Sequence, residues 1–189
     1  MVPDNLTIVC YTGGSCGDLI TAMIDHRGSK FMPNHTVKHI DERQRLKKPH
    51  LFASDKEKDQ YLLDIAQQYN SIPSHDLDYH IRRGHKFISI VVDDIDVACW
   101  AAKRFKDLHR PHVWEEMSKM CGAKTVDDYA QILIYYSNMV RNYTTHTVSL
   151  ESIKQKTAIA NLEQALGQTI SQSGKNVYRN WWNLQHNSI

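Results

Sequence analysis

A glycine-rich loop near the start of the chain has the residue types that bind phosphate groups. Residues 11–23 read YTGGSCGDLITAM and follow a β-rich run, LTIVCY. If a helix begins just after the loop, its backbone N–H groups and its dipole attract an anion. Glycine also lets the backbone approach a phosphate closely. The sequence therefore predicts a phosphate site made of backbone amides, in residues Thr12, Gly13, Gly14, Ser15, Cys16, Gly17 and Asp18.

The loop departs from the Walker pattern G-x-x-x-x-G-K-[ST] at the positions that carry its chemistry. Thr12 takes the place of the first glycine, Asp18 that of the lysine and Leu19 that of the Ser/Thr. An ATP or GTP hydrolase of the standard type is therefore not predicted. The alternative role for these glycines is a tight turn between strand and helix, chosen for its geometry alone.

His75, in the segment SIPSHDL, is a candidate general base, because a histidine can take a proton from an acceptor hydroxyl near neutral pH. The alternative is an ordinary edge-strand histidine, since Pro73 favours an edge position for this segment. His75, His80 and His85 recur every five residues, which places them on one face of neither a helix nor a strand. No metal site is predicted for them.

Asp93 and Asp94 follow the most apolar run of the chain, FISIVV. An acid in this place can hold Mg²⁺ in a kinase-like site. It can also cap the next helix, and the cap is the expectation here.

Strands and helices alternate along the sequence, which predicts an α/β fold in three layers, with a short, mostly parallel sheet flanked by helices. We expect one domain over residues 1–189, with a helical C-terminal part at 112–189. Residues 27–53 are polar and are expected to be a solvated loop or short helix rather than a binding arm. Strands are predicted at 5–11, 85–94 and 146–150, an extended edge segment at 71–80, and helices at 17–26, 54–69, 94–105, 112–121, 125–143, 157–167 and 174–185.

The composition is that of a globular protein, with 41% hydrophobic and 23% charged residues among 189. The formal net charge of +2 gives no indication of nucleic-acid binding. The four cysteines form no C-x-x-C pair. The sequence carries no secretory signal and no apolar run of membrane-spanning length, so we expect a cytoplasmic protein without a membrane partner.

In the order of its motifs the chain resembles the sulfotransferase branch of the P-loop proteins. There a first strand and loop, similar to TIVCYTGGSCGDLI, hold the 5′-phosphosulfate end of the donor. An extended T-H-L-P segment, similar to IPSHDL, carries the catalytic base. The pattern K-V-I-Y-V-x-R-x-x-x-D-V-A-x-S, similar to KFISIVVDDIDVACW, binds the donor's 3′-phosphate. HTVSLESIKQ and IANLEQALG are similar to the family's last strand, turn and helix.

The resemblance implies sulfuryl transfer from 3′-phosphoadenosine 5′-phosphosulfate to a hydroxyl or amine of a small-molecule or saccharide acceptor, with His75 as the base. The chain is shorter than typical members, as are compact, divergent members carried by phages and marine bacteria. The alternatives are a P-loop nucleotide or sugar kinase that uses ATP with Mg²⁺, and a relative that kept the fold as a non-catalytic binding or structural module.

The chain departs from the family at its charged donor contacts. Gly13 or Gly14 stands where the loop carries lysine or arginine, Val92 replaces the 3′-phosphate arginine, and Trp100 replaces its partner serine. Each lost charge-assisted hydrogen bond removes roughly 1.5–3 kcal/mol of donor binding. Other cations would have to supply the charge, and the candidates are Arg82, Arg83, Lys86 and the basic residues of 38–48.

Overall fold

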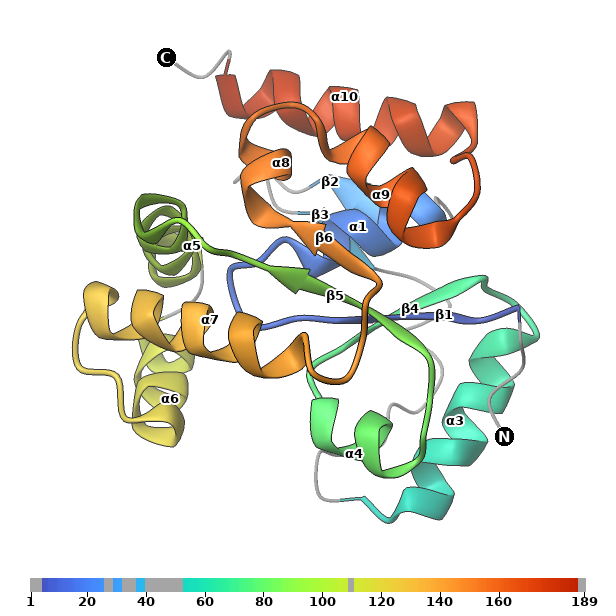
Figure 1. The fold of residues 1–189 in the computed structure, drawn as a ribbon, viewed down its shortest axis with the longest axis horizontal. Helices are drawn as coiled ribbons and strands as arrows, with labels where there is room; N and C mark the ends of the chain where they lie inside the picture. Colours follow the sequence, from blue (N-terminus) through green and yellow to red (C-terminus); the bar gives the residue numbers. More distant parts are fainter. Residues whose placement is uncertain (1–4, 26–28, 32–36, 40–52, 109–110, 187–189) are drawn as a thin grey trace.

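Four parallel strands form the central sheet of the protein (Figure 1). The computed structural model describes residues 5–25, 29–31, 37–39, 53–108 and 111–186. Within them the strands of this sheet lie in the order β4-β1-β5-β6. Their bounds are Thr7–Cys10 for β1, Ser71–Ser74 for β4, Phe87–Val91 for β5 and Thr147–Ser149 for β6. A separate antiparallel pair joins β2, Ser29–Phe31, to β3, Val37–His39.

Helices connect the strands and make up most of the chain after β5. Before β5 these are α1 (Gly17–Ile24), α3 (Asp55–Ala66) and α4 (Leu77–Arg82). After β5 they are α5 (Ile95–Leu108), α6 (Pro111–Cys121), α7 (Val126–Val140), α8 (Leu150–Lys154), α9 (Ala158–Leu166) and α10 (Gln172–His186).

The sheet is covered on both faces, as the continuous apolar run of β5 predicts. All of β5 is buried, and its side chains alternate between two cores. Ile88 and Ile90 join one core with α1, α5, α9 and α10, whereas Phe87 and Val91 join another with α3, α4 and the end of α7. Figure 1 shows α1 and α10 on one side of the sheet and α3 and α4 on the other. The predicted α/β architecture with a parallel sheet is confirmed.

Several helix ends follow the sequence signals. Ser54 and Glu57 form a capping box at the start of α3: the Ser54 N–H donates to Glu57 Oε2 at 2.9 Å, and the Glu57 N–H donates to Ser54 Oγ at 3.4 Å. Thr125 caps α7 in the same way. Gly167 ends α9 in a left-handed conformation, φ 67°. Tyr178 and Trp181 are buried and dock α10 against the body.

The structure differs from the predictions in three places. The edge segment is a strand only over Ser71–Ser74, because Asp76 then starts α4 by accepting the Tyr79 N–H at 3.2 Å. Helix α8 was not predicted and begins after Ser149, which caps it. Parts of 27–53, expected to be loop or short helix, form β2 and β3. The basic residues at positions 40–48 lie outside the described residues.

Candidate functional site

The candidate phosphate loop lies at the carboxyl end of β1. Next to this strand, the direction in which the chain adds strands to the sheet reverses. From β1 the chain goes to β4 on one side, and from β5 it goes to β6 on the other. The segments that follow β1 and β5 therefore leave the sheet in opposite directions. Open α/β sheets bind ligands in the crevice that such a switch point creates. The fold thus places residues 12–18 where a ligand site is expected.

The loop makes one tight turn before α1. The Ser15 N–H donates to the Thr12 carbonyl at 3.2 Å, and the Thr12 and Ser15 hydroxyls are 2.9 Å apart. Cys16 has a left-handed conformation, φ 61°, at the start of the helix. Among the described residues, the N–H groups of Gly13, Gly14, Cys16 and Gly17 have no acceptor. Donors of this kind at a helix start can bind an anion.

Close packing accounts for the three glycines of the loop. A Cβ atom on Gly13 would lie 2.7 Å from the Phe105 ring, and one on Gly14 would lie 2.4 Å from the Ala101 carbonyl oxygen. One on Gly17 would lie 2.1 Å from the Tyr11 ring. The alternative role, a turn chosen for geometry, therefore holds for these residues. The presence of these glycines alone is no evidence for phosphate binding; the groups that could bind an anion are the backbone amides of the loop.

Among the described residues, Arg104 on α5 is a cation that the fold brings to this loop. Burial raises the pKa of the Cys16 thiol, and the Arg104 guanidinium beside it partly opposes that shift. The guanidinium carbon lies 5.8 Å from the centre of the Trp100 ring and 5.5 Å from that of Trp181. These contacts are within cation–π range and hold the side chain in place. No motif of the sequence pointed to Arg104, because only the docking of α5 brings it near residue 16.

Two of the cations considered from sequence instead pair with α3. Arg82 binds Asp55 at 3.1 Å, and Arg83 forms an ion pair with Asp59. Both lie on or next to α4, on the face of the sheet opposite α1. Lys86 precedes β5, at the amino end of the sheet. The structure therefore brings none of these three residues to the loop.

His75 lies beside the loop because β4 pairs with β1. Its Nδ1 is 2.9 Å from the Tyr11 carbonyl oxygen, and the two rings are 4.2 Å apart between centroids. A carbonyl only accepts hydrogen bonds, so Nδ1 carries the proton and Nε2 keeps the lone pair that a base needs. His75 is exposed. The sequence predicted both His75 and the loop as candidate site residues, and the fold places them side by side.

Asp18 belongs to the same cluster. The pKa of the Tyr11 phenol is raised well above its usual range by burial first and then by the Asp18 carboxylate, to which it hydrogen-bonds. The side chain at the Walker lysine position is thus tied to the residue that also fixes His75.

The positions that depart from the family pattern are used for packing. Val92 is buried in the core, and its N–H donates to Ser137 Oγ at 2.8 Å. Trp100 is partly buried, under Arg104. Neither position supplies charge for a 3′-phosphate.

Asp93 and Asp94 both have protein partners. Asp94 Oδ1 accepts the N–H groups of Asp96 and Val97 at 2.8 and 3.1 Å, which makes it the cap of α5. Asp93 binds Arg141 through both carboxylate oxygens, at 2.8 and 2.7 Å. The expected cap is found, and this geometry gives no support to a magnesium site at Asp93 or Asp94.

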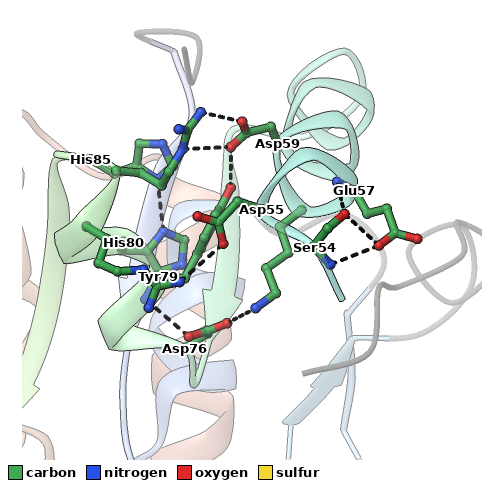
Figure 2. Close-up of polar contacts among 11 residues, drawn as sticks. Ser54, Asp55, Glu57, Asp59, Asp76, Tyr79, His80 and His85 are labelled. Carbon is green, nitrogen blue, oxygen red and sulfur yellow. Dashed lines mark hydrogen bonds and ion pairs between the residues drawn. The ribbon is translucent and has the colours of Figure 1, made fainter. Parts of the chain in front are cut away.

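The other two histidines form a pair away from His75. His80 Nδ1 lies 3.1 Å from His85 Nδ1 (Figure 2). His80 Nε2 lies 2.8 Å from Ser74 Oγ. Burial, and then the neighbouring His85, lowers the pKa of His80 to about 4. Within the described part of the chain, no three histidine, cysteine or acidic side chains gather as metal ligands. The sequence missed this pair because Gly84, with φ 65°, turns the chain back.

Comparisons of the chain with protein-family models, with curated proteins and with solved structures found no match. The described residues contain no helix long and apolar enough to cross a membrane.

Proposed function

We propose that the protein is a sulfotransferase-like group transferase with a P-loop-type site. It would move a sulfuryl group from 3′-phosphoadenosine 5′-phosphosulfate to a hydroxyl or amine of a small-molecule or saccharide acceptor. The observation that carries the proposal is the contact of His75 Nδ1 with the Tyr11 carbonyl, 2.9 Å, next to the loop. This contact sets the tautomer of a general base at the edge where an α/β fold binds ligands.

In this mechanism the loop holds the donor and His75 activates the acceptor. The N–H groups of Gly13, Gly14, Cys16 and Gly17 would bind the phosphosulfate oxygens, and Arg104 would supply the positive charge. His75 Nε2 takes the acceptor proton as the acceptor oxygen attacks sulfur. The bond from sulfur to the bridging phosphate oxygen breaks, and adenosine 3′,5′-bisphosphate leaves. His75 then releases its proton to solvent.

The acids after β5 favour this reaction over a kinase. A P-loop kinase needs an acid there to hold Mg²⁺ between its phosphates. Asp94 is engaged as the cap of α5 and Asp93 in a two-point ion pair with Arg141. A magnesium role would require one of them to give up these contacts.

Ligand-dependent melting separates the three candidate functions. A ligand at 100 times its Kd stabilises the fold by about 2.7 kcal/mol. The proposal expects adenosine 3′,5′-bisphosphate to raise the melting temperature and adenosine, which lacks both phosphates, to leave it unchanged. A rise with ATP and Mg²⁺ alone would favour the kinase. No rise with any of them would favour a non-catalytic module.

Replacement of His75 tests its role as the base. His75→Ala should lower sulfuryl transfer by about 10²- to 10⁴-fold, because proton transfer in the transition state is lost. The shift in melting temperature with the bisphosphate should remain, since the loop amides are intact. His112→Ala, an exposed histidine on α6, is the matched control and should retain full transfer. Full transfer by His75→Ala would rule out His75 as the base.

A further inference from the structure

A second set of nucleophilic and basic side chains lies on the face of the sheet that α3 and α4 cover. Ser74 is the last residue of β4, and its Oγ is 2.8 Å from His80 Nε2. The other nitrogen of that ring, Nδ1, is 3.1 Å from His85 Nδ1. A hydroxyl and two imidazoles therefore form a continuous row. A nucleophile in contact with a base, which a third group orients, is the arrangement of covalent catalysis.

The surrounding side chains fix both imidazole rings. The Tyr79 ring makes edge contacts with His80 and His85, with centroid distances of 4.9 and 5.4 Å. The Tyr79 hydroxyl in turn donates to Asp59 on α3 at 2.7 Å. Figure 2 shows the Tyr79, His80 and His85 side chains together, facing Asp59. The base is thus held in one orientation by packing against Tyr79, whose own hydroxyl is anchored to α3.

Ser74 is also held in place, yet it can be reached. The Asp76 N–H donates to Ser74 Oγ at 3.2 Å, and Asp76 is anchored by Lys58 at 2.6 Å. Ser74 is partly exposed, whereas His80 is 2% exposed. The residue that carries the nucleophile is therefore partly open to solvent, while its base is shielded from water.

The hydrogen bonds of the row define the path of the proton. When Ser74 donates its hydroxyl proton to His80 Nε2, His80 Nδ1 must carry a proton and donate it to His85 Nδ1. His85 then acts as the acceptor of this hydrogen bond, which fixes the tautomer of His80 that leaves Nε2 free of a proton. His85 also lines a surface hollow of about 480 Å³, so this end of the row is in reach of solvent.

We propose that Ser74 is an activated nucleophile, with His80 as its base and His85 as a positioning residue, and that it cleaves small carboxylic esters. Ser74 Oγ attacks the carbonyl carbon, its proton moves to His80 Nε2, and a C–O bond forms. The ester C–O bond then breaks, and the leaving alkoxide takes the proton from His80. In the second half, His80 Nε2 takes a proton from water as the water oxygen bonds to the acyl carbon. The bond from that carbon to Ser74 Oγ then breaks, Ser74 Oγ takes the proton from His80, and the carboxylic acid leaves. This activity goes beyond the sulfuryl transfer proposed above and uses none of its residues.

A fluorophosphonate probe tests the nucleophile directly in the full chain. Serine attack forms an O–P bond and releases fluoride, and mass spectrometry identifies the modified residue. We expect one label, on Ser74, and none after Ser74→Ala. Ser173→Ala, an exposed serine on α10, is the matched control and should label as the wild type does. A wild-type protein that remains unlabelled, or is labelled elsewhere, overturns the proposal. This outcome needs no variant, so it holds even if Ser74→Ala fails to fold.

Hydrolysis of p-nitrophenyl acetate tests the roles of the two histidines. His80→Gln should lower the rate by about 10²- to 10⁴-fold, as expected for the loss of a general base. His85→Ala should lower the rate less and also move the midpoint of the pH–rate profile upward, because His85 helps to lower the pKa of His80. A purely structural His85 would change the amplitude and leave the midpoint in place. An unchanged rate in His80→Gln, or an unchanged midpoint in His85→Ala, contradicts its assigned role.

Discussion

Gly14 combines two constraints that only glycine meets. Its φ is +87°, and a Cβ atom there would lie 2.4 Å from the Ala101 carbonyl oxygen. A left-handed conformation costs a non-glycine residue about 1–2 kcal/mol, and overpacking against backbone adds about 1–3 kcal/mol. We predict that Gly14→Ala lowers the free energy of unfolding by at least about 2 kcal/mol, as measured by urea denaturation.

Gly122 is the matched control for this substitution. Its φ is +77°, but no described atom lies within 4 Å of the position of a Cβ. Gly122→Ala should therefore lower the free energy of unfolding only by the cost of the left-handed conformation, about 1–2 kcal/mol. Equal losses for the two variants would show that the loop moves away from α5 at little cost, and would contradict the close packing described here.

At the scale of single residues, sequence reasoning found side chains that are local to one motif and missed those that meet through the fold. The loop residues and His75 could be named because each lies in a recognisable segment. Arg104 could not, since it reaches Cys16 from the third turn of α5. The row of Ser74, His80 and His85 also depends on a turn, at Gly84, that periodicity does not reveal.

At the scale of elements, substitutions of Asp94 can distinguish its role as a helix cap from a role as a metal ligand. Its side chain caps α5, and asparagine caps helices as well as aspartate does, whereas alanine does not. We predict that Asp94→Ala loses about 1 kcal/mol of stability and that Asp94→Asn loses little, both measured by urea denaturation.

A magnesium role for Asp94 would give a different pattern. Asp94→Asn would then abolish any stabilisation by ATP and Mg²⁺ that the wild type shows, because the carboxylate charge is lost. The same two variants thus test the cap and the kinase alternative together. Similar losses of stability in Asp94→Ala and Asp94→Asn would contradict the cap.

Longer elements were predicted well because several signals agree in each. Helices α3 and α7 have both an apolar stripe and a capping box, and the β5 strand is apolar throughout. The short helices α4 and α8, with bounds Leu77–Arg82 and Leu150–Lys154, were missed. Elements this short carry little periodicity, so that their capping residues, Asp76 and Ser149, are the only local signal.

At the scale of the whole molecule, the alternation of strands and helices predicts a parallel sheet but leaves the order of its strands open. The order of the strands determines which residues meet at the candidate site. Since β1 pairs with β4 on one side and β5 on the other, His75 and the loop meet at one edge. With β4 next to β6 instead, the same residues would lie far apart. The pairing depends on contacts between distant segments, which local patterns do not encode.

The stability of the whole fold should fall in mild acid because His80 is buried in its neutral form. Its pKa is lowered from 6.5 to about 4, mainly by burial and then by His85, against an opposing effect of Asp76 and a further lowering by Lys58. His80 therefore binds a proton near pH 6.5 in the unfolded chain, but only near pH 4 in the folded protein. The stabilisation is present above pH 6.5 and is lost as pH falls, by roughly 3 kcal/mol in total.

The pH window distinguishes this effect from that of the carboxylates. Asp59 and Glu151 have lowered pKa values, so their contribution is lost only below about pH 4.5. Urea denaturation at pH 7, 6 and 5 should show a decline in wild-type stability over this range and a shallower one in His80→Gln, which cannot take the proton. The burial that drives this decline is the same burial that shields the base of Ser74. An equally steep decline in His80→Gln would show that the folded protein protonates His80 as readily as the unfolded chain does, which would contradict the lowered pKa of His80 and its burial in the neutral form.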